Sequence, residues 1–135
     1  MNGMQAVTDL ALYLSKKIKD VAVFKIEKPV NYALPYICLN YLSISYGSWV
    51  NTSCIVNVNV HVPDLNNGMP DTLKLQQISQ SVMELIPPKN TTTEDDEREL
   101  IINGNWYHLE ADSNCIKDVD NTHFINLRVQ VTFTN

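Results

Sequence analysis

An alternation of apolar and polar side chains from Asn51 to Val62 constrains the fold more than any other feature of this sequence. Side chains of a β-strand point alternately to its two faces, so the pattern predicts a strand with one buried and one wetter face. The segment is longer than the usual strand of ~5–6 residues. Its apolar positions are Cys54, Val56, Val58, Val60 and Val62, and its polar positions are Asn57, Asn59 and His61.

Two other segments have apolar side chains at three- and four-residue steps, which is typical of amphipathic helices. The first covers residues 4–18 and ends in lysines, which suit the negative end of a helix dipole. The second runs from about Thr72 to Ile86. We expect Asp71 to cap its N-terminus and the Pro87-Pro88 pair to end it.

The remaining elements are predicted to be strands and loops. Residues 36–46 should pair with residues 51–62 as one long antiparallel hairpin, and residues 21–26 and 123–134 are further strands. Asn103-Gly104 is a strong two-residue hairpin signal. Residues 90–99 and 112–121 are polar and are predicted as loops, the first exposed and acidic. The fold class is therefore α+β, a single domain over 1–135. Its antiparallel or mixed sheet has a long hairpin and two helices packed on one face.

Composition is that of one ordinary globular domain. The chain has 135 residues, of which 44% are hydrophobic and 19% charged, and a domain usually holds roughly 100–200 residues. Apolar runs stay well short of the ~20 residues of a membrane span, and we expect no signal peptide. Three cysteines without a CxxC pair favour a reducing compartment.

Charge is unevenly distributed along the chain. Residues 1–35 carry five lysines against three acids, a net +2, and the other residues carry five basic and twelve acidic groups, a net −7. The acidic part argues against binding nucleic acid through its phosphates, which needs clustered lysine and arginine. The asymmetry is compatible with head-to-tail contact between copies, or simply with a solvated surface.

The sequence contains no spacing typical of a catalytic, cofactor or metal site. The three histidines lack HxH or HxxxH spacing, and we interpret each as an ordinary surface or edge residue. His108 and His123 are candidates for the same sheet face. Cys115 is predicted to be the accessible thiol, whereas Cys38 and Cys54 lie in strands, where cysteine behaves as a small apolar residue. We therefore predict that the chain is not an enzyme.

The hairpin has an unusual lack of charge. No lysine, arginine, aspartate or glutamate occurs between Tyr36 and Val62, although exposed strands are normally protected by charge. This predicts a covered surface, with self-association or a protein partner as the cover.

Two stretches carry a resemblance to a known family. The run Val56-Asn57-Val58-Asn59-Val60-His61-Val62-Pro63-Asp64 leads through Gly68-Met69-Pro70-Asp71 into the second helix, and the last strand begins His123-Phe124-Ile125-Asn126-Leu127-Arg128-Val129. With the order of elements, this resembles the tail terminator or tail-completion proteins at the head-tail junction of tailed bacteriophages. The resemblance covers most of the chain by topology.

The resemblance implies a structural protein of the virion neck, assembled in the bacterial host cytoplasm. Its partners would be other copies in a homo-hexameric ring, the phage connector or adaptor, and tail proteins. Genomic DNA would only pass through the lumen, and no cofactor, reaction or membrane is involved. A negative lumen would let DNA slide without capture.

Two loops are candidates for the lumen or docking surfaces. The acidic loop contributes Glu94, Asp95, Asp96 and Glu97, and the loop before the second helix contributes Asp64, Asn66, Asn67 and Asp71. Neutralising the second loop is expected to impair assembly and leave folding intact.

Two other classes of function stay open. One is a small cytoplasmic bacterial module that binds a ligand or peptide, possibly as a dimer, which needs a concave apolar pocket with a few polar groups. The other is a dimeric α+β barrel enzyme with histidine or tyrosine as acid-base, which needs two titratable groups converging at one site.

Overall fold

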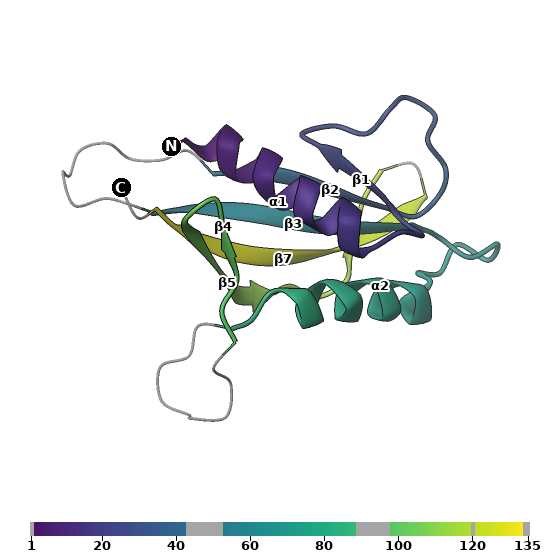
Figure 1. The fold of residues 1–135 in the computed structure, drawn as a ribbon. Helices are drawn as coiled ribbons and strands as arrows, with labels where there is room; N and C mark the ends of the chain where they lie inside the picture. The colour runs from purple at the N-terminus through teal and green to yellow at the C-terminus, as the bar shows by residue number, and fades with distance from the viewer. Residues whose placement is uncertain (1, 43–52, 89–97, 120, 134–135) are drawn as a thin grey trace.

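The computed structural model describes residues 2–42, 53–88, 98–119 and 121–133, and it has two helices and seven strands (Figure 1). The first half contains α1 (Gly3–Lys17), β1 (Ala22–Lys25), β2 (Tyr36–Tyr41) and β3 (Ser53–Pro63). The second half contains α2 (Thr72–Leu85), β4 (Ile101–Ile102), β5 (Asn105–Asp112), β6 (Ile116–Lys117) and β7 (Thr122–Thr132). Both helices, β3 and β7 lie close to the ranges that their patterns predict.

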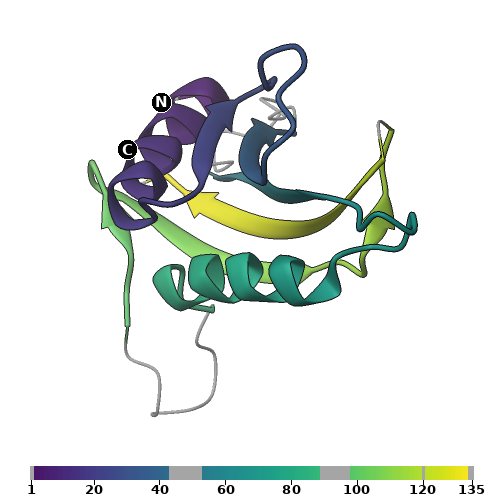
Figure 2. The ribbon, with the colours of Figure 1, turned by 90° about the vertical axis from the view of Figure 1, so that its right-hand side faces the viewer.

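All seven strands belong to one mixed sheet in the order β1-β2-β3-β7-β5-β4, with β6 pairing β7 beside this path. Only the β1–β2 pair is parallel, and every other described pair is antiparallel. β3 lies between β2 and β7 and pairs with β7 along its whole length, from Ser53 opposite Thr132 to Pro63 opposite Thr122. Figure 2 shows how strongly the sheet curls.

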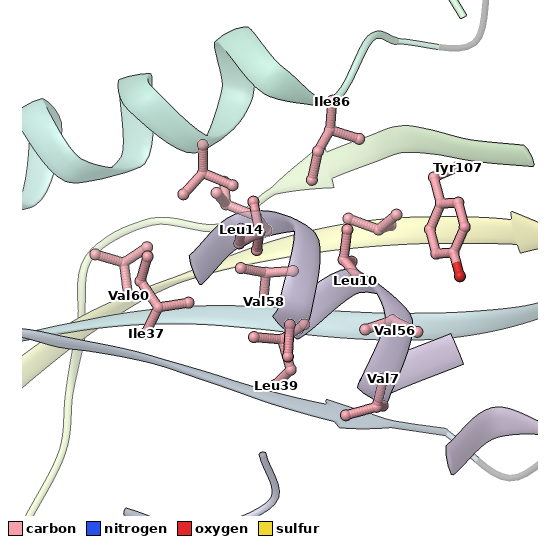
Figure 3. Packing of buried hydrophobic residues seen from close by; sticks show 14 of the residues in the cluster. Val7, Leu10, Leu14, Ile37, Leu39, Val56, Val58, Val60, Ile86 and Tyr107 are labelled. Carbon is pink, nitrogen blue, oxygen red and sulfur yellow. The ribbon is translucent and has the colours of Figure 1, made fainter. Parts of the chain in front are cut away.

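Both helices pack on the same face of the sheet, as predicted. The apolar side of β3 (Val56, Val58, Val60) is fully buried in one cluster with Leu10 and Leu14 of α1 and with Leu75 and Val82 of α2. Figure 3 shows α1 above these valines, with Ile37 and Leu39 of β2 beside them. Burying each such side chain stabilises the fold by about 1.5–3 kcal/mol, so the apolar positions of β3 contribute directly to holding the helices on the sheet.

The ends of both helices and the turn between β4 and β5 are fixed by local interactions. Asn2 and Asp71 cap the two helices by accepting hydrogen bonds from the backbone N–H of Gln5 and Lys74. Asn103 and Gly104 have φ of 51° and 81°, and Ile102 pairs with Asn105 around them. These values are those of a type I′ hairpin turn, which Asn-Gly favours because both residues tolerate positive φ.

The uncharged hairpin is covered by this chain's own strands. β2 and β3 pair as predicted, but β1 lies on the other side of β2 and β7 on the other side of β3. Neither is an edge strand, so neither needs charged side chains to block pairing with another chain. The missing charge therefore does not by itself require a covering partner, and such a partner stays a prediction. The predicted turn and the end of the first hairpin strand, residues 43–52, lie outside the described residues.

One predicted loop contains a strand. Residues 112–121 include β6, whose Ile116 and Lys117 pair with Phe124 and His123 at the start of β7. This pair is too short to leave a period-two pattern in the sequence, and its backbone hydrogen bonds with β7 form only once the sheet has assembled.

Candidate functional site

The polar face of the sheet carries a connected row of asparagines. Asn57 of β3 donates from Nδ2 to Oδ1 of Asn40 on β2, at 3.0 Å. Asn126 of β7 donates to Asn57 and Asn59 at 3.2 and 2.8 Å. The side chains that alternate with the core valines therefore tie three strands together, and this face is polar but not freely solvated.

Toward the end of β3 this row gives way to a stack of rings. The imidazole of His61 lies between Tyr36 of β2 and Phe124 of β7, with ring centroids 4.5 and 5.0 Å away and interplanar angles of 6° and 21°. Phe24 of β1 and Tyr32 of the β1–β2 connection continue the cluster, with their centroids 5.0 Å apart. Strand pairing places Tyr36, His61 and Phe124 directly opposite one another.

A tight turn brings the β1–β2 connection over this stack. The N–H of Glu27 donates to the carbonyl of Lys25 at 2.7 Å, and Ile26 between them has φ of 69°. A β-branched residue is strained at positive φ, and such strain commonly marks functional positions. The turn directs Glu27 and Lys28 toward the polar face.

The result is a cleft with an aromatic floor and charged walls. A cavity of about 420 Å³ lies over His61 and Phe124, and one of about 470 Å³ extends past Tyr32 to Asn121. Lys28, Tyr36 and Asp118 line both cavities. Together they form what we call the aromatic cleft. Its lining is partly apolar with a few convergent polar groups, which is the usual character of a small-molecule site.

His61 and Asp118 are the titratable pair of the aromatic cleft. Nδ1 of His61 lies 3.1 Å from Oδ2 of Asp118 without hydrogen-bond geometry. Burial lowers the pKa of His61 from its ordinary value of 6.5; Asp118 opposes this shift and Lys28 adds to it. The imidazole is therefore neutral at pH 7. It can accept or donate a proton toward a bound molecule, with the Asp118 carboxylate close to its Nδ1.

A second histidine–aspartate pair lies at the same end of β3. Nδ1 of His123 and Oδ1 of Asp64 are 2.6 Å apart, and the side chains are 13% and 4% exposed. His123 stands opposite Val62, whereas His108 stands opposite Gln130. Since residues 123 and 130 of β7 point to opposite faces, His108 and His123 do not share one. His61 and His123 are also largely buried, so the interpretation of these two histidines as ordinary surface or edge residues was wrong. His108 lies on β5, which at that position pairs only with β7 among the described strands.

The predicted docking residues before α2 have different surroundings. Asp64 is held by His123, and Asp71 by the N-terminus of α2. Asn67 accepts a hydrogen bond from the N–H of Met69 at 3.1 Å, and Asn66 is exposed. Three of the four therefore make hydrogen bonds within this chain. Glu94, Asp95, Asp96 and Glu97 lie outside the described residues.

The cysteines lie where their sequence positions indicate. Cys38 and Cys54 are buried and Cys115 is exposed. Burial raises the pKa of Cys54 to about 11 and also raises that of Cys38. Neither buried thiol is activated as a nucleophile, because the thiolate is the reactive form.

Within the described ranges, no three or more His, Cys, Asp or Glu side chains are grouped to hold a metal ion. Neither described helix has the length and apolar character of a membrane span. Sequence reasoning did not find the aromatic cleft, because His61 and Asp118 are far apart in the chain and no local motif joins them. No protein-family model and no curated protein matches this sequence.

Proposed function

We propose that this chain is a structural protein of the bacteriophage head-tail junction, a tail terminator or neck ring protein. Copies of it assemble into a ring, with six as the expected number, through which DNA passes. Its partners are the phage connector or adaptor and the tail proteins. It resides in the virion after assembly in the host cytoplasm, and it has no catalytic role.

The observation that carries this proposal is the order and pairing of the elements. A helix, a short strand, a long antiparallel pair, a second helix and closing strands follow one another, which is the order on which the family resemblance rests. The closing strand β7 returns to the centre of the sheet beside β3. Both stretches that carry the resemblance therefore lie side by side.

The distribution of charge supports assembly between copies. Four of the five N-terminal lysines are exposed, near the end of α1 and at the end of β1, while the rest of the chain has a net charge of −7. Opposite charges at separate places on one surface favour head-to-tail contacts, which close into rings when the rotation between copies fits.

Native mass tests the proposal. Light scattering after size exclusion, over a range of protein concentration and salt, is expected to give a species of about six copies of the 15.3 kDa chain. Electron microscopy of that species should show rings with a central hole. A dimer whose mass does not change with concentration would contradict a ring protein.

The aromatic cleft favours a second candidate, a small cytoplasmic binding module. Planar aromatic acids are suitable probes, because stacked rings and Lys28 would contact both parts of such a molecule. Saturable chemical-shift changes at Tyr36, His61 and Phe124 would support this function, and their absence across a panel of such acids would argue against it.

A further inference from the structure

A second groove lies beside the sheet edge and shares Glu27 and Lys28 with the aromatic cleft. α1 and β1 run side by side (Figures 1 and 2), and a cavity of about 670 Å³ lies between them. Ala11 and Leu12 of α1 form one wall, and Val23, Phe24 and Lys25 of β1 form the other. We call this the edge groove. Leu12 is 55% exposed, so its side chain is accessible to a bound segment.

The wall formed by β1 offers unpaired backbone. Ile26 donates its N–H to the carbonyl of Leu39 on β2. Alternation along a parallel pair then turns the peptide groups of Phe24 toward β2 and those of Val23 away from it. No described strand lies beyond β1. The groove thus joins a free strand edge to a helix wall that carries Ala11 and Leu12 beside the polar Thr8 and Ser15. A strand edge next to a helix is the arrangement that lets a domain bind an extended segment as an added strand.

Charge indicates the occupant. Lys25 and Lys28 outnumber Glu27 along the groove, and Lys16, Lys17 and Lys19 follow at the exposed end of α1. Residues 94–99 of the same sequence carry five acids and one arginine, a net −4. Opposite charges of this size steer two surfaces together.

We propose that the edge groove binds the acidic segment 94–99 of a second copy, added as a strand beside β1. This inference rests on the proposed function, because it supplies the contact between neighbours in the ring. The groove and the acidic segment are different parts of the chain, so the contact is head-to-tail and every copy offers both halves. An edge strand of this kind otherwise exposes pairing groups, and only Lys25 protects it.

A peptide tests the groove separately from the ring. A synthetic peptide of residues 92–101 is titrated into the monomeric protein at low concentration and followed by amide chemical shifts. We expect saturable changes at Leu12, Val23 and Lys25. Leu12→Glu should weaken binding at least about tenfold, because it places a carboxylate against an acidic ligand in an apolar groove.

Two controls keep the result specific. Leu73→Glu alters a leucine of α2 that is 65% exposed but outside the groove, and peptide binding should not change. A peptide of the same composition in scrambled order should bind at least tenfold more weakly. Equal binding of both peptides would show charge attraction without strand addition, and would overturn the inference. Absence of binding would overturn it as well.

The full-length chain separates this inference from the proposed function. If the unmodified protein forms rings and Leu12→Glu abolishes them, both hold. Rings that persist in Leu12→Glu would overturn the groove contact and leave the ring intact. If the peptide binds but the protein is a dimer at every concentration, the binding site in the edge groove is supported and the proposed ring is contradicted. Combining Lys25→Glu with Asp95→Lys should restore assembly that Lys25→Glu alone reduces, and failure to restore it would contradict the assigned occupant.

Discussion

Asp64 and His123 join the end of β3 to the start of β7 through a contact of 2.6 Å between Oδ1 and Nδ1. The backbone strengthens the junction, since the N–H of Asp64 donates to the carbonyl of Asn121 at 2.8 Å. The Asp64 side chain is only 4% exposed. This carboxylate, expected from the sequence to be a docking residue, therefore holds the two central strands together.

Replacing Asp64 by Asn should destabilise the protein by about 1 kcal/mol, because the amide oxygen can still accept from His123 but the buried hydrogen bond no longer involves a charged acceptor. Urea unfolding measures the change. Asp71→Asn is the matched control from the same loop, and it should be nearly neutral because Asn is an equally good N-cap. Equal stability of both variants would mean that Asp64 has no structural role.

His61 makes stability depend on pH in a defined window. Burial lowers the pKa of His61 in the native protein below its ordinary value of 6.5. Between the native pKa and 6.5, the unfolded chain therefore binds a proton that the native state does not. The free energy of unfolding should fall as the pH drops through this window, by at most about 1.4 kcal/mol per pH unit. As the pH rises above 6.5 the contribution of His61 to the slope fades, because the unfolded chain also loses this proton.

Urea unfolding between pH 5 and pH 8 checks the assignment. His61→Asn should remove this part of the slope and leave the contribution of the other titrating groups. An unchanged slope in the variant would show that His61 does not titrate differently in the two states.

Gly3 and Tyr41 form a steric pair. A Cβ on Gly3 would clash with Cδ2 of Tyr41, so Gly3→Ala should cost about 1–3 kcal/mol of stability from overpacking. Helix propensity alone predicts the opposite sign, a gain of up to about 1 kcal/mol. In a Tyr41→Ala background the ring is gone, and Gly3→Ala should then be neutral or stabilising. Chemical denaturation of the unmodified protein, the two single variants and the double variant gives the coupling free energy between residues 3 and 41.

Tyr107 has a buried hydroxyl without a hydrogen-bond partner among the described residues. Tyr107→Phe keeps the ring and removes this desolvated group, so it should stabilise the protein by about 1 kcal/mol. Tyr107→Ala should instead cost about 3–5 kcal/mol through the cavity it leaves. Thermal and urea unfolding distinguish these cases, and a loss of stability in Tyr107→Phe would show that the hydroxyl has a partner.

Ile26 is strained at φ of 69° and is 44% exposed. Ile26→Gly should raise the free energy of unfolding by about 1 kcal/mol, because glycine adopts this conformation without strain. Val30→Gly is a control in the same connection, where the residue is 88% exposed and has no positive φ, and it should not stabilise. A destabilising effect of Ile26→Gly would mean that the turn is unstrained.

The sequence alone determined the elements whose information is local. The alternation through β3, the apolar stripe of each helix, the Asp71 cap and the Asn103-Gly104 turn are read from neighbouring residues, because side-chain direction and turn geometry repeat over a few positions. Burial of Cys38 and Cys54 followed from the same local reasoning.

Only the tertiary structure determined which strands and side chains are neighbours. β1 and β7 flank the hairpin and remove the need for a covering partner, and Asp118 reaches His61 from a segment far along the chain. Asp64 became a buried partner of His123 for the same reason. Strand order and cross-strand register depend on the free energy of the whole packed core, and no short stretch of sequence carries that information.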